Sequence, residues 1–146
     1  MITEHYDYFA YESKTLYLFE SEGEQGAIIK IVMFTPYESN FWNLAFGDVN
    51  DNSIDDSVIS NNHDIVKIMS TIGKIVYDFS AQYPTRGIYI RPVDEKRKKL
   101  YNHVFRRNYD AISRVFDVLG IFDAIEEEYS PKKSYDVFKL KRKFVK

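Results

Sequence analysis

The segment RPVDEKRKKLYNHVFRR, residues 91–107, contains seven of the chain's twenty Lys and Arg residues in seventeen positions. A helix advances about 100° per residue, so most of these cations fall on one side of a helix that begins at Asp94. Cationic side chains on one helix face can contact successive phosphates of a nucleic acid without reading its sequence. We therefore take as candidate anion-binding residues Lys96, Arg97, Lys99, His103, Arg106 and Arg107.

Two readings of this basic segment stay open. His103 and Tyr101 could add stacking or hydrogen bonds, as aromatic side chains do in proteins that bind single-stranded RNA. The same charges are also typical of an ordinary solvated helix face, with Asp94 and Glu95 favouring the helix start. No helix-turn-helix or RNP motif accompanies the charges. The segment by itself therefore indicates an anionic partner, either nucleic acid or an acidic protein, without selecting between them.

The segment DVNDNSIDD, residues 48–56, is rich in the oxygen donors that suit Mg²⁺ or Ca²⁺. Its spacing imitates the first ligand positions of an EF-hand loop, but Ser53 and Ile59 stand where that loop needs glycine and a bidentate Glu. Asp and Asn are also common in metal-free turns, because their side chains bond to nearby backbone. As candidate metal ligands, with Mg²⁺ the possible cofactor, we take Asp48, Asp55 and Asp56.

Catalytic motifs are missing from the sequence. There is no G-x-S-x-G, Walker-type or H-E-x-x-H pattern, and the three histidines (His5, His63 and His103) are too few for a multi-histidine metal site. A base such as His63 beside Asp64 could still serve a nuclease, since many ribonucleases need only scattered polar residues. We favour a protein with no catalytic residues, and keep a metal-dependent nuclease as the alternative.

Charge is divided unevenly along the chain. Residues 1–64 hold twelve Asp and Glu against two Lys, whereas residues 65–146 hold eighteen Lys and Arg against ten acids. Such asymmetry favours a charged partner, and it would equally suit self-association, so a homodimer is a further possibility. The chain has no cysteine, no apolar run of membrane-spanning length and no apolar N-terminal segment. These features predict a cytoplasmic protein that does not enter a membrane.

Periodicity predicts the elements that carry these residues. Alternating or continuous apolar runs indicate strands at residues 15–21, 27–35, 41–48 and, less regularly, 54–59. The spacing of Ile65, Ile68, Ile72, Val76 and Phe79 predicts a helix that starts at Asn62 or Asp64 and has ended by Pro84. A strand in residues 86–92 leads into the basic helix, which extends from Asp94 through residue 107 and onward to Leu119, with Gly120 as its stop.

The C-terminal part completes this pattern. The segment IFDAIEEEY, residues 121–129, fits either a short helix or a loop, and residues 134–146 contain a final strand with a basic end. This order predicts a single α+β domain over residues 1–146. We expect a mostly antiparallel sheet of about five to six strands, packed on one face by two main helices.

Several segments occur in the order expected for one protein family: GAIIKIVMFTP, NLAFGD, IDD, NNHD, RKKLY and YDVFKLKRK. Together they make the chain resemble an uncharacterised bacterial family, found mainly in Bacteroidetes, that is described only as a domain of unknown function. That family usually has Gly-Ser-Thr before its basic helix, where this chain has Pro92, Val93 and Asp94. The resemblance implies the fold and the compartment and carries no activity. A protein-interaction or self-assembly module therefore stays a third functional alternative.

Overall fold

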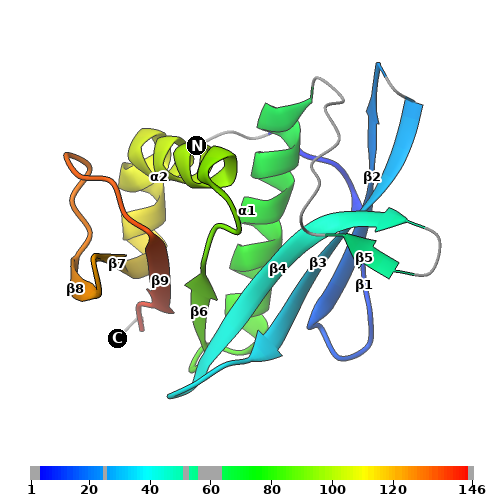
Figure 1. Cartoon of the computed structure of the whole chain (residues 1–146). Coiled ribbons are helices and arrows are strands. Elements are labelled where there is room, and N and C mark those ends of the chain that lie inside the picture. Colours follow the sequence, from blue (N-terminus) through cyan, green and yellow to red (C-terminus); the bar gives the residue numbers. More distant parts are fainter. Residues whose placement is uncertain (1–3, 25, 51–52, 56–63, 145–146) are drawn as a thin grey trace. The chain divides into compact units, whose positions relative to one another are not determined.

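The computed structural model describes residues 4–24, 26–50, 53–55 and 64–144, which contain nine strands and two helices (Figure 1). In chain order these are β1 (Tyr8–Ala10), β2 (Leu16–Gly23), β3 (Gly26–Pro36), β4 (Phe41–Asn50), β5 (Ser53–Asp55), α1 (Ile65–Gln82), β6 (Gly87–Ile90), α2 (Glu95–Val115), β7 (Phe116–Phe122), β8 (Ile125–Glu128) and β9 (Val137–Arg142).

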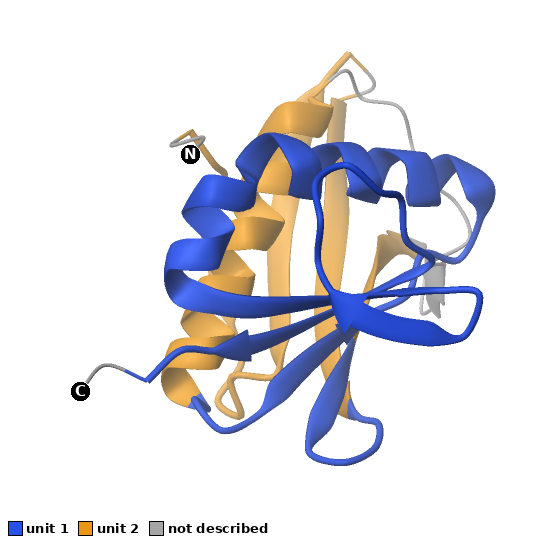
Figure 2. Ribbon diagram, turned by 90° about the vertical axis from the view of Figure 1, so that its left-hand side faces the viewer, with its two compact units in different colours: residues 1, 36–43, 83–146 blue, residues 2–35, 44–82 orange. Residues whose placement is uncertain are grey.

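The chain divides into two compact units, drawn in different colours in Figure 2. One comprises residues 2–35 and 44–82 and has four Lys and Arg against twelve Asp and Glu, so we call it the acidic unit. The other comprises residues 1, 36–43 and 83–146 and has sixteen Lys and Arg against ten acids, so we call it the basic unit. The prediction of a single domain over residues 1–146 stays a prediction.

The acidic unit packs α1 against an antiparallel group of strands. β1 pairs with β2, β2 pairs with β3, and β4 pairs with β5, all antiparallel. The rings of Phe34 in β3 and Phe79 in α1 stack with their centroids 3.9 Å apart. The Tyr6 backbone N–H donates to Thr71 Oγ1 at 2.9 Å, which fixes the chain before β1 against the helix. The predicted apolar stripe of this helix is therefore the side that forms the core.

The basic unit is built on strands in the order β4, β6, β9, β7 and β8. Its β4–β6 pair is parallel, and the other pairs are antiparallel. Phe105 in α2 stacks on Phe138 in β9 with ring centroids 4.2 Å apart. The buried Asn102 side chain donates to the Tyr135 carbonyl at 2.9 Å and accepts from the Tyr135 N–H at 2.8 Å. These contacts hold one face of α2 against the strands and leave its opposite face in solvent.

The α+β class and the mostly antiparallel pairing are confirmed, but the expected strand number is wrong because nine strands are present in the described residues. The helix prediction onward to Leu119 is also wrong, since α2 ends at Val115 and the following residues form β7. Gly120 is not a helix stop. It lies within β7 where any Cβ would overlap the Tyr135 ring, so only glycine fits there.

The segment IFDAIEEEY, which we expected to be a helix or a loop, belongs mostly to the β7–β8 hairpin. Asp123 and Ala124 form its turn with φ of +51° and +65°, the positive values that a type I′ turn requires. Within the described residues β8 is the last strand of the order and pairs with β7 alone. Its residues Glu126, Glu127 and Glu128 therefore line an outer strand of the basic unit.

Candidate anion-binding surface

Asp94 sets the start of the basic helix. Its extended backbone places it at the N-cap of α2, and its Oδ1 accepts from the Arg97 N–H at 2.8 Å. This contact satisfies one of the helix-start N–H groups that have no partner within the helix. The prediction that Asp94 begins this helix is confirmed, and the helix then carries the basic residues for three turns.

Five of the six predicted anion-binding residues are exposed on α2: Lys96, Lys99, His103, Arg106 and Arg107. Their spacing of three and four residues places them along one side of the helix. Arg106 is held in place, because its Nε donates to the Pro131 carbonyl at 3.0 Å. The side chains of the other four make no hydrogen bond or ion pair with the described part of the chain. We call these five residues the α2 basic face.

Arg97 does not belong to the α2 basic face. Its side chain is only 3% exposed, and its Nη1 donates to Asp94 Oδ2 at 3.0 Å. The physical reason lies in the spacing, because Arg97 precedes Tyr101 and Phe105 by four and eight residues and therefore shares their inward-facing row. Its Nε and Nη2 atoms are buried and have no hydrogen-bond partner in the structure described.

Several other cations of the basic unit are paired with carboxylates. Lys98 Nζ lies 2.5 Å from Asp136 Oδ1, and this contact raises the pKa of Lys98 and lowers that of Asp136. Three further ion pairs lie in or near the C-terminal strands: Lys133 with Glu127, Lys139 with Glu126, and Lys143 with Asp117. The basic end of β9 is therefore partly neutralised, in contrast to the α2 basic face.

The predicted metal ligands do not form a described site. Asp48 is 2% exposed and makes an ion pair with Lys30, which is fully buried, so its carboxylate already has a cation. Asp55 is the β5 partner of Asp48, while Asp56 and His63 lie outside the described residues. Among the described residues, no group of three or more His, Asp or Glu side chains is arranged to hold a metal. The metal role of Asp48, Asp55 and Asp56 stays a prediction.

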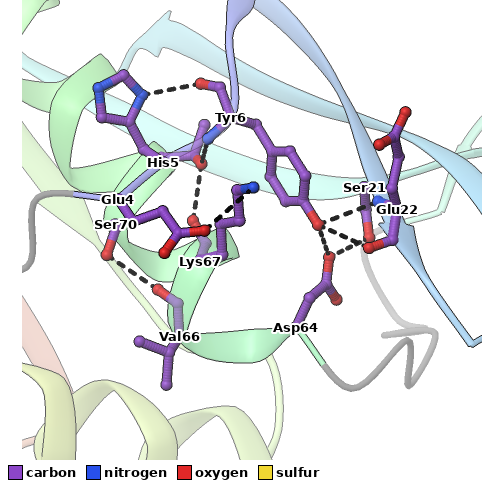
Figure 3. A network of polar contacts seen from close by, with 10 residues as sticks. Glu4, His5, Tyr6, Ser21, Glu22, Asp64, Val66, Lys67 and Ser70 are labelled. Carbon is purple, nitrogen blue, oxygen red and sulfur yellow. Dashed lines mark hydrogen bonds and ion pairs between the residues drawn. The ribbon is translucent and has the colours of Figure 1, made fainter.

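Sequence reasoning missed a polar cluster at the start of α1 (Figure 3). Asp64 precedes the helix as one of the two predicted caps, and its main-chain carbonyl accepts from Ile68 N–H. Its Oδ2 accepts at 2.5 Å from both the Tyr6 hydroxyl and the Ser21 hydroxyl. Burial, followed by the Asp64 contact, raises the pKa of Tyr6. The Asp64 carboxylate thereby joins two distant segments to the start of α1, which gives this cluster a structural role.

Comparison with known proteins places the chain in a family. A family model described as a family of unknown function (DUF6934) matches residues 2–143. The chain belongs to this family. The match confirms the expectation of a domain of unknown function that covers nearly the whole chain. A search of curated proteins and a search of solved structures each found no match.

Neither α1 nor α2, the two helices of the described residues, combines the length and the apolar character needed to cross a bilayer.

Proposed function

We propose that this family member is a cytoplasmic, non-catalytic binding protein that engages nucleic acid through the α2 basic face. One observation supports the proposal most strongly. Lys96, Lys99, His103 and Arg107 are exposed without a described partner along one helix face, whereas several other cations of the same unit are paired with carboxylates. A partner supplying phosphates would give these side chains the counter-charges that the described chain does not.

The dimensions of the face support a nucleic acid over a single small anion. From Lys96 to Arg107 the helix advances by about 16 Å at ~1.5 Å per residue. A nucleic acid strand presents a phosphate about every 3.4 Å of duplex axis, so a surface of this length would meet several of them. Such contacts are sequence-independent, and we expect binding that follows charge more than base sequence.

The test measures binding of a labelled 20-nucleotide duplex and the matching single-stranded RNA by fluorescence anisotropy. We expect log Kd to rise with log salt concentration with a slope of about 3, as for three to four released counterions. Reversing two charges, Lys99→Glu with Arg107→Glu, should weaken binding at low salt by at least about tenfold. The matched control, Lys141→Glu with Lys143→Glu, changes the net charge equally but alters the end of β9.

Three results would overturn the proposal. Equal losses in the two double variants would mean that the overall charge, and not the α2 basic face, governs binding. Binding to poly-glutamate but to neither nucleic acid would assign an acidic protein as the partner. Mg²⁺-dependent cleavage of the RNA, abolished by Asp56→Asn, would establish the nuclease alternative.

A further inference from the structure

We propose that the Nε–Nη2 edge of Arg97 binds a phosphate group carried by a small ligand. This proposal does not rest on the nucleic-acid function, because Arg97 is buried and lies off the α2 basic face. It starts from how the guanidinium is held. Asp94 accepts from the Arg97 backbone N–H through Oδ1 at 2.8 Å and from Nη1 through Oδ2 at 3.0 Å. One carboxylate therefore fixes both the helix start and the orientation of the guanidinium.

The other two guanidinium nitrogens of Arg97, Nε and Nη2, lie on the same edge of the group. Nε–H and one N–H of Nη2 project in parallel from one edge of the planar guanidinium, and Nη1 lies on its other side. That edge is the fork that receives two oxygens of a carboxylate or phosphate. Both Nε and Nη2 are buried and without a hydrogen-bond partner in the described chain. Buried donors are almost always paired, because an unpaired one keeps the cost of desolvation and gains nothing in return.

The surroundings of the edge favour a phosphate over a carboxylate. The guanidinium lies beside the N-cap of α2, a helix of twenty-one residues whose N-terminal end carries partial positive charge. Asp94 is bound to Arg97, and Lys98 is paired with Asp136. Lys96 and Lys99 then remain against Glu95, so the helix start keeps a net positive charge. A phosphate monoester carries nearly two negative charges at neutral pH. Its attraction to this position therefore exceeds that of a singly charged carboxylate.

The experiment follows the Arg97 Nε–Hε resonance of the full chain by ¹H–¹⁵N NMR, assigned through its own side chain. Inorganic phosphate and acetate are titrated separately, with chloride holding the ionic strength constant. We expect phosphate to shift this resonance at a concentration at least about tenfold below that of acetate. Because both nitrogens are covered by protein, neighbouring side chains must move for the ligand to enter, and we expect association slower than the diffusion limit.

Two variants sharpen the result. Arg97→Lys keeps the charge and removes the fork, and it should weaken phosphate binding, measured by calorimetry, by at least about tenfold. Arg107→Lys, the matched control on the exposed side of the same helix, should leave phosphate binding unchanged. If Arg97→Lys does not fold, the titration of the unaltered chain decides alone.

Two outcomes would overturn the assignment. An Arg97 resonance that neither anion moves would mean that the edge is not a ligand site. Equal responses to acetate and phosphate would mean that the edge does not select phosphate. Failure here is distinguishable from failure of the nucleic-acid proposal. Lys99→Glu with Arg107→Glu should weaken nucleic-acid binding by at least about tenfold and leave the phosphate shift of the Arg97 resonance in place, whereas Arg97→Lys should weaken phosphate binding measured by calorimetry.

Discussion

Lys30 in the acidic unit and Arg97 in the basic unit are both buried cations bound to an aspartate, but their surroundings differ. Lys30 is fully buried, and the side chain of its partner Asp48 is only 3% exposed. Arg97 is 3% exposed, and the side chain of its partner Asp94 is 44% exposed. One pair is closed inside the protein, whereas the other reaches the surface through its carboxylate and keeps two donors unused.

The comparison separates a structural charge from a functional candidate. A buried pair in which each charge is compensated is costly to break and offers no position for a ligand. A buried cation with unused donors carries a desolvation cost that the described fold does not offset. Burial alone therefore does not identify a binding residue. Buried donors left without an acceptor are what make Arg97 a candidate to be tested.

The largest effect is expected for Lys30→Met, which leaves the Asp48 carboxylate buried without its cation. The free energy of unfolding, measured by urea denaturation, should fall by about 3–5 kcal/mol. The double variant Lys30→Met with Asp48→Leu removes both charges and should recover most of that loss. A single variant that stays within about 1 kcal/mol of the unaltered chain would contradict the view of a closed pair.

An intermediate effect is expected for two tyrosines of the basic unit. Both are uncharged, and the hydroxyl of one has hydrogen-bond partners whereas the hydroxyl of the other has none in the described structure. The Tyr135 hydroxyl contacts Glu127 Oε2 and accepts from the Ser130 N–H, both at 3.0 Å, whereas the buried Tyr129 hydroxyl has no partner in the described structure. Tyr135→Phe should lower the free energy of unfolding by about 1–2 kcal/mol. Tyr129→Phe, the matched control, should be neutral or stabilising. Thermal and urea denaturation measure both variants, and equal losses of unfolding free energy in Tyr135→Phe and Tyr129→Phe would contradict this expectation.

The smallest effect is expected for Arg97→Met. The change removes the Asp94 ion pair, but it also removes two buried donors that have no acceptor, so the two effects oppose each other. The free energy of unfolding should therefore stay within about 1 kcal/mol of that of the unaltered chain. A loss as large as that of Lys30→Met would show that the chain already satisfies the Arg97 edge.

Much of the fold could be predicted because its signals are local. The apolar spacing in α1 and the alternation in β2 depend only on residues that are neighbours in the sequence. The β8 strand could not be predicted in this way, since Glu is uncommon in strands. Its glutamates are accommodated by distant partners: Glu126 contacts Lys139, and Glu127 contacts Lys133.

The site was predicted only in part, for a related reason. Helical spacing correctly gave the exposed side of α2, but Arg97 was counted by its charge although it shares a row with Tyr101 and Phe105. Its spacing from Tyr101 and Phe105 was the sequence feature that indicated burial of Arg97. Burial of Lys30 was also indicated in the sequence, because it is a single cation within the apolar run AIIKIVMFT. The sequence cannot show that this strand cation reaches Asp48, which we predict as a metal ligand from its position in an Asp-rich segment.

The outer position of β8 bears on how the protein avoids polymerisation. A terminal strand displays unpaired backbone groups that can template the addition of another chain. On β8, Glu126 and Glu127 are paired with Lys139 and Lys133, and Glu128 has no ion pair in the described chain, so a second copy approaching edge to edge would meet a row of charged side chains. Charged side chains of both signs along this edge therefore make it a poor template for the addition of another strand.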